Sequence, residues 1–130
     1  MLESLIRHDK LLLSLLENSN YTNVQLDVFM SYVMIRRSQG KLEDIINAKD
    51  GSKVTRGSFL RTLEQARSNI KSSVYSILLL GYLGFADSNF IDGFIRISRM
   101  LEELNRVGYV NDPKEIVELI NKLSDRLSDL

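Results

Sequence analysis

Cysteine and tryptophan are absent from this chain of 130 residues, and proline and histidine occur once each. Without cysteine there is no disulfide framework and no thiolate metal site, which fits a reducing cytoplasm. The single histidine, His8, leaves no histidine cluster for a metal and no histidine-dependent catalytic triad. We therefore expect no metal, no cofactor and a chain of the mostly helical type that low proline content favours.

Long apolar runs and enzyme motifs are missing as well. The longest uncharged run, 72–86, has 15 residues, whereas a membrane helix needs roughly 20. Charged residues interrupt 1–16, so no secretory signal is expected there. The sequence contains no phosphate-binding loop, dinucleotide fingerprint or nucleophile elbow. The neighbouring acids Glu43/Asp44 and Glu102/Glu103 would diverge around their helices. We expect neither membrane insertion nor enzymatic activity.

Charge is balanced overall but unevenly distributed. The formal net charge is zero, which excludes a coat protein whose whole surface is basic. By region, however, residues 1–52 carry −1, residues 53–86 carry +4 and residues 87–130 carry −3. If the chain binds nucleic acid, it should bind through the middle region.

Apolar residues recur at steps of three and four through most of the chain, which predicts an all-α domain of about six helices. An N-terminal leucine-rich helix spans 2–16 and a second helix spans 24–37, with Leu26, Phe29, Met30 and Val33 facing inward. A short helix spans 41–48. A long helix capped by Thr55 or Ser52 extends to about 80. The segment 74–85 is apolar on nearly all sides and should form the buried centre of a monomer or dimer.

Two further helices complete the predicted domain. One spans about 90–106, and the other begins with Asp112-Pro113 and carries a narrow seam of Ile116, Ile120, Leu123, Leu127 and Leu130. An alternative makes 85–97 a β-hairpin, the wing of a winged helix, with Asp92-Gly93 at its tip. In the main, all-helical prediction the whole chain is one helical domain, and residues 74–130 form helices for packing or dimerisation.

The beginning of the long helix has an unusual surface. Phe59, Leu63, Ala66 and Ile70 form its apolar stripe. The opposite face lacks the usual mixture of acids and bases. It carries a polar row made of Ser58, Arg61, Thr62, Gln65, Asn69 and Ser72. Between 53 and 71 five basic residues stand against the single acid Glu64, an excess that a DNA phosphate backbone would attract.

The region 24–72 has the layout of a supporting helix, a short helix, a turn and a basic helix. The segment from Lys41-Leu42-Glu43-Asp44-Ile45-Ile46 to Val54-Thr55-Arg56-Gly57-Ser58-Phe59-Leu60-Arg61-Thr62-Leu63 resembles the helix-turn-helix of bacterial and archaeal regulators and of the promoter-reading region of sigma factors. The resemblance covers about thirty residues. The turn, 49–53, is longer than the usual three to four residues.

The resemblance implies a transcriptional regulator that reads double-stranded DNA through the helix starting near Thr55. Arginine can donate two hydrogen bonds to guanine, asparagine and glutamine amides can bind adenine, and serine and threonine hydroxyls can reach base edges. The candidates for base contact are therefore Ser58, Arg61, Thr62, Gln65 and Asn69. The candidates for phosphate contact are Lys53, Arg56, Arg67 and Lys71. A homodimer is expected because one helix reads only a few base pairs. The alternative is a non-enzymatic helical module that binds another protein.

Overall fold

The structure is a computed structural model that describes residues 2–48, 55–108 and 112–128. Every regular element in these ranges is an α-helix, so the all-α prediction is confirmed, with seven helices where about six were expected. The helices are α1 (Leu2–His8), α2 (Lys10–Glu17), α3 (Asn23–Arg37), α4 (Leu42–Ala48), α5 (Arg56–Tyr82), α6 (Ser88–Val107) and α7 (Lys114–Ser128).

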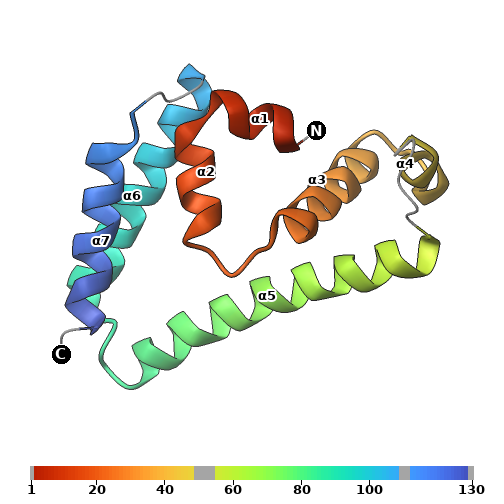
Figure 1. Cartoon of the computed structure of the whole chain (residues 1–130). Coiled ribbons are helices and arrows are strands. Elements are labelled where there is room, and N and C mark those ends of the chain that lie inside the picture. Colours follow the sequence, from red (N-terminus) through yellow and green to blue (C-terminus); the bar gives the residue numbers. More distant parts are fainter. Residues whose placement is uncertain (1, 49–54, 109–111, 129–130) are drawn as a thin grey trace.

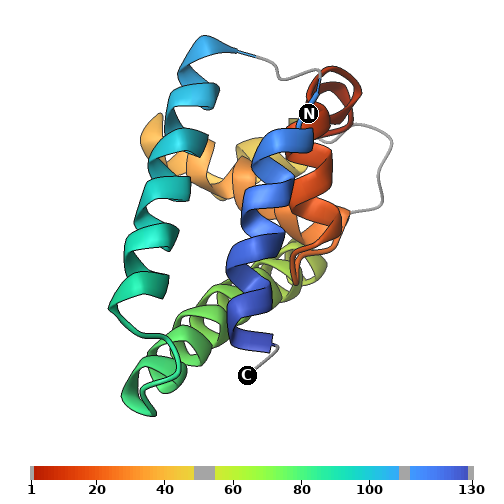
Figure 2. The ribbon, with the colours of Figure 1, turned by 90° about the vertical axis from the view of Figure 1, so that its left-hand side faces the viewer.

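The long helix α5 organises the arrangement. Figure 1 shows α3 lying along the first half of α5, with α4 at the same end. A hairpin of α6 and α7 rises from the other end of α5, and α1 and α2 lie between these two parts. Figure 2, seen from the side, shows α6 and α7 next to each other with α5 crossing beneath them.

Two hydrophobic clusters hold these parts together. The first cluster contains Val28, Ile45, Phe59 and Leu63, and it joins α3, α4 and α5. Phe59 is the most completely buried large side chain of the described residues, with 1% of its surface exposed. The second cluster joins the end of α5 to the hairpin through Ala86, Phe90 and Leu123, with Ile77, Leu80, Ile97 and Leu127 packed around it.

The N-terminal segment differs from the single helix predicted for 2–16. Asp9 has an extended backbone with φ −129°, and its carboxylate accepts a hydrogen bond from the Leu12 N–H at 3.0 Å. Asp9 thus caps α2 and separates it from α1. A capping aspartate inside a leucine-rich run was the feature that the helical periodicity concealed.

The side of α3 that is buried also differs from the predicted side. Val28 is its buried residue, and Tyr32 and Ile35 pack on the first cluster beside Phe29. The other predicted inward residues, Leu26, Met30 and Val33, are only half-buried. Because α3 carries apolar side chains on more than one side, the sequence alone did not define which side would meet α5.

The apolar segment 74–85 is not the buried centre of the monomer. Only Ile77 and Leu80 of this part of α5 pack into the second cluster. Seven large side chains around them are each more than half exposed, and we call them the apolar face: Val74, Tyr75, Leu78, Leu79, Tyr82, Leu83 and Phe85. The prediction of burial within one chain was therefore wrong, since α6 and α7 cover only one side of the helix.

The alternative of a β-hairpin at 85–97 is also wrong. Asp87 caps α6 by accepting a hydrogen bond from the Phe90 N–H at 3.0 Å, and the helix continues to Val107. Gly108 ends it with a φ of +122°. In α7, Ile116 and Leu123 of the predicted seam are buried, and Leu130 lies outside the described residues.

Candidate nucleic-acid interface

The start of α5 is fixed by a cap. The Thr55 hydroxyl accepts a hydrogen bond from the Ser58 N–H at 3.0 Å, and the Thr55 carbonyl accepts one from the Phe59 N–H at 2.9 Å. The prediction of Thr55 as the capping residue is confirmed. Ser52, the other candidate, lies outside the described residues. The cap orients the first turn of α5, in which Arg56, Gly57 and Ser58 are exposed.

The first hydrophobic cluster determines which face of α5 remains open. Phe59, Leu63 and Ala66 are buried toward α3, with at most 2% of their surface exposed. Successive residues of an α-helix are turned by about 100°. Side chains roughly opposite these three must therefore point away from α3. Arg61, Glu64, Gln65 and Ser68 are all exposed there.

Three of the five predicted base-contact residues lie together on this open side. Ser58, Arg61 and Gln65 are exposed, and the helical turn places them within about 60° of one another. We call these three residues the exposed row. Within the described part of the chain, Arg61 forms no ion pair. Its guanidinium group is available to an external acceptor.

The other two predicted base-contact residues have partners within the protein. The Asn69 amide donates to the Asn20 carbonyl at 3.0 Å and to the Gln25 side chain at 2.8 Å. The Thr62 hydroxyl donates to the Ser58 carbonyl at 3.1 Å. Both side chains are half-buried. They stand beside the exposed row, and Asn69 fastens α5 to the segment that leads into α3.

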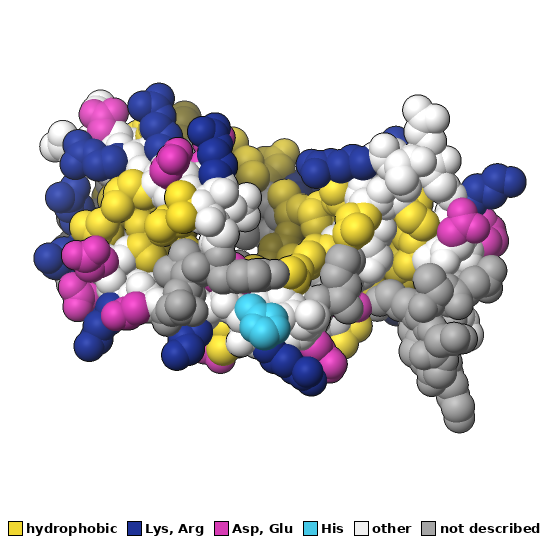
Figure 3. Space-filling model, turned by 90° about the horizontal axis from the view of Figure 1, so that it is seen from above, with side chains coloured by type: hydrophobic (Ala, Val, Ile, Leu, Met, Phe, Trp, Pro, Cys, Tyr) yellow, Lys and Arg dark blue, Asp and Glu magenta, His cyan; other side chains and the backbone are white. Residues whose placement is uncertain are grey.

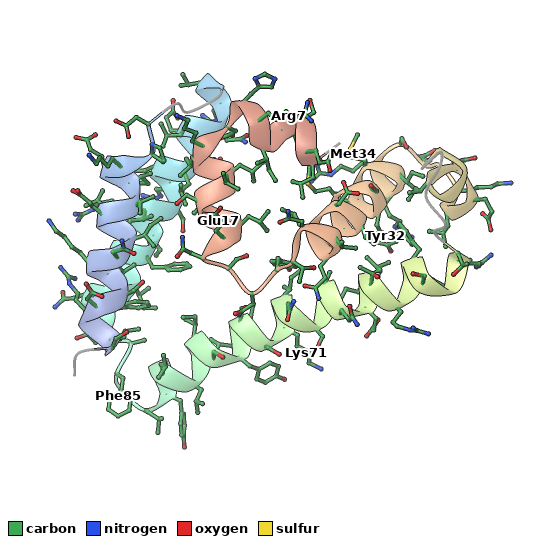
Figure 4. All side chains as sticks on the ribbon, in the orientation of Figure 1. Arg7, Glu17, Tyr32, Met34, Lys71 and Phe85 are labelled. Atoms are coloured by element: carbon green, nitrogen blue, oxygen red, sulfur yellow. The ribbon has the colours of Figure 1, made fainter. Side chains whose placement is uncertain are left out.

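The predicted phosphate-contact residues are distributed over the other flank of α5. Arg56 pairs with Glu43 of α4 at 2.8 Å, and both side chains are more than half exposed. The Arg67 guanidinium lies 4.8 Å from the centre of the Tyr32 ring. Figure 4 shows Tyr32 between α3 and α5, and Lys71 on the side of α5 that faces away from α3. Lys53 lies outside the described residues.

The helical turn separates these basic residues from the exposed row. Arg67 is turned by about 120° from Arg61, and Lys71 by about 80°. Arg67 and Lys71 therefore both lie on the same flank of the exposed row. A surface ion pair such as Arg56–Glu43 is weak, so a phosphate could replace the carboxylate at little cost.

Two features of this region escaped the sequence reasoning. Arg36, at the end of α3, lies 6.0 Å from the same Tyr32 ring as Arg67, so two guanidinium groups meet beside one aromatic ring. Thr22 caps α3 through a reciprocal pair of hydrogen bonds with Gln25. The spacing Thr-x-x-Gln was the pattern that would have identified this cap.

Tyr21 ties the same segment to α5. Its hydroxyl donates a hydrogen bond to the Ala66 carbonyl at 3.3 Å. Burial raises the pKa of the Tyr21 hydroxyl above its ordinary value of 10.0, because the charged phenolate would lose water. Tyr21 and Asn69 together hold the middle of α5 against the entry to α3.

The opposite end of the molecule carries charges of both signs. Seen from above in Figure 3, basic and acidic side chains alternate around the end formed by α6 and α7, at the left. Arg106, for example, is within ion-pair distance of both Glu102 and Glu103. Such mixed charge offers no continuous basic surface at this end of the molecule.

The described residues include no group of three or more histidine, aspartate or glutamate side chains arranged to hold a metal ion. None of the helices in these ranges is long and apolar enough to cross a membrane. Comparison of the chain with models of protein families, with curated proteins and with solved structures found no match.

Proposed function

We propose that this protein binds double-stranded DNA through the exposed row of α5, as a non-enzymatic regulator of transcription acting in the cytoplasm. The observation that carries the proposal is the uncovered face at the start of α5. The cluster around Phe59 fixes the orientation of this helix against α3 and α4, and Ser58, Arg61 and Gln65 are exposed on the side that it leaves open.

The chemistry of the exposed row suits the major groove. Arginine can donate two hydrogen bonds to guanine, glutamine can bind adenine through both atoms of its amide, and serine can reach a base edge or a phosphate. Because Asn69 and Thr62 have partners within the protein, we assign the main base contacts to Arg61 and Gln65. Arg56, Arg67 and Lys71 are the proposed phosphate contacts, and Arg36 is added to them.

One helix reads only a few base pairs, so we expect two copies of the chain to act on a two-fold symmetric site. The zero net charge implies that attraction to DNA is local. It should therefore depend on a few phosphate contacts and weaken as salt is added.

The first test is fluorescence anisotropy of labelled random-sequence duplex DNA, titrated with the protein at low and at moderate salt. We expect binding at low salt that weakens steeply at moderate salt, as the release of counterions from several phosphates requires. Absence of binding at low salt would contradict the proposal.

The second test assigns the site. Arg61→Ala should weaken DNA binding by about 1–3 kcal/mol, the range for losing a bidentate arginine contact. Arg99→Ala is the matched control, because it removes the same charge from an exposed position on α6. If the two variants bind DNA equally well, Arg61 is not a DNA contact.

A second candidate function, a helical module that binds another protein, is favoured by one observation. The apolar face of α5 leaves seven large side chains more than half exposed, and exposed apolar patches of this kind mark interaction surfaces. A protein that fails to bind DNA at low salt while retaining its fold would support this candidate instead.

A further inference from the structure

The second half of α5 carries an apolar surface that its own chain leaves open. Tyr82 exposes 90% of its surface, Tyr75 65% and Leu78 63%. These three residues recur at steps of four and three, so they form a seam along one side of the helix, with Val74 and Leu79 on either side. The opposite side, with Ile77 and Leu80, packs on the α6 and α7 hairpin.

We propose that this apolar face binds the same face of a second copy of the chain, with the two α5 helices antiparallel around a two-fold axis near Leu78. Such an isologous contact uses one surface twice. The seam of α7, the other dimer surface that the sequence indicated, is unsuitable because Ile116 and Leu123 are buried within the chain.

The area of the apolar face matches what a stable pair requires. Taking about 200 Å² as the full surface of a large apolar side chain, the exposed fractions of the seven residues correspond to roughly 800 Å². Each partner in a standard-size interface buries about 800 Å². A monomer seldom leaves a contiguous patch of this size in water.

The charges around the face are compatible with self-association. The 15 residues 72–86 contain no charged side chain, so two copies meet without repulsion at the centre. Lys71 precedes the face and Asp87 follows it. Asp87 lies beyond the end of α5, where the buried Ala86 turns the chain back toward Leu80 and Asp87 caps α6.

The pairing would also orient the exposed row, a consequence that rests on the proposed DNA binding. The exposed row is turned by about 90° from the seam of Tyr75, Leu78 and Tyr82. In an antiparallel pair the two-fold axis is perpendicular to the plane containing both helices. Side chains turned by 90° from the contact consequently point to the same side in both copies, where one duplex can reach them.

The first experiment measures the mass of the full chain by sedimentation equilibrium from micromolar to near-millimolar concentration. We expect the mass of two chains. Leu78→Glu should shift it to one chain over most of this range, with at least tenfold weaker association. Met34→Glu is the control, since Met34 is similarly exposed but lies on α3 outside the face. This variant should keep the mass of two chains, and circular dichroism should show that both variants remain helical.

The second experiment uses the absence of cysteine. Because Leu78 lies near the proposed axis, Leu78→Cys should form a disulfide-linked pair on mild oxidation, whereas Met34→Cys should not. A single-chain mass for the unmodified protein, larger open assemblies, or equal cross-linking of both variants would overturn the proposal. None of these readouts involves DNA. Loss of DNA binding in a chain that still pairs would contradict only the proposed function.

Discussion

Among individual residues, Tyr21 has the clearest link between environment and stability. Its hydroxyl is the donor to the Ala66 carbonyl, and it lies near the Asn69 bridge to Asn20 and Gln25. These contacts join residues more than forty positions apart in the sequence. They hold the middle of α5, just beyond the exposed row.

The Tyr21 contact predicts a pH-dependent difference between the natural chain and Tyr21→Phe. At neutral pH the variant should be less stable by about 1 kcal/mol, the net value of one hydrogen bond. Burial raises the pKa of Tyr21 in the folded state. Its contribution is therefore complete below the unfolded pKa near 10 and is lost as the pH rises through the folded pKa.

Urea unfolding of both proteins, at neutral pH and at several alkaline pH values, measures this difference. Effects of the other tyrosines and lysines are common to both chains and cancel in the comparison. A difference that stays constant through the alkaline range would show that the Tyr21 hydroxyl does not titrate in this way.

At the scale of the helix, α5 is the element on which the other parts depend. Its cap at Thr55 and its buried residue Phe59 fix the first turns, and its last turn leads directly into the second cluster. Within the first turn, Gly57 is a weak point, since glycine in a helix costs stability relative to alanine.

We expect Gly57→Ala to stabilise the protein by about 0.5–1 kcal/mol. A methyl group added at Gly57 would meet no atom within 4 Å, so the gain in helix propensity is not offset by a clash. Gly108→Ala is the contrasting control. There φ is +122°, and the substitution should destabilise. Chemical denaturation of both variants gives the values, and destabilisation by Gly57→Ala would contradict this account of the helix start.

Local chemistry made most helices predictable. Thr55, Asp87 and Asp112 accept hydrogen bonds at the starts of α5, α6 and α7, and side chains of these types indicate helix starts in a sequence. The break at Asp9 was missed because leucines continue on both sides of it. The burial of Val28 was missed because α3 offers apolar residues on several sides, and only packing against α5 and α1 selects among them.

The candidate site was predictable only as far as side-chain chemistry and helical spacing reach. Both placed Ser58, Arg61 and Gln65 on one side of a helix. They could not show that Asn69 is held by Asn20 and Gln25, or that Arg67 lies over Tyr32. Those contacts join segments far apart in the sequence, and their existence depends on how α3 packs against α5.

For the whole molecule, the important feature is that two separate hydrophobic clusters share one helix. The first cluster lies around Phe59 and the second around Phe90. Besides α5, the described residues connect the two clusters mainly through α2, whose leucines approach Leu101 and Leu104 of α6. We therefore expect the two ends to differ in local stability.

Phe90→Ala should destabilise the second cluster by about 3–5 kcal/mol, as large-to-small substitutions in a core do. Hydrogen exchange should then show lost amide protection in α6 and α7, with protection largely kept in α3 and in the first half of α5. Phe59→Ala should give the reverse pattern. Equal loss of protection throughout the chain in both variants would show instead that the molecule unfolds as one cooperative unit.

Because α5 is unbroken, its length sets the distance between the exposed row and the apolar face. No proline interrupts it, and its only glycines, Gly57 and Gly81, lie at its two ends. At about 1.5 Å per residue, the middle of the exposed row is roughly 25 Å from Leu78. Two chains joined at Leu78 would hold their exposed rows roughly 50 Å apart, a separation between the 34–36 Å of one turn of duplex DNA and the span of two turns. In such a pair the length of α5 would select DNA targets by the spacing of their two half-sites.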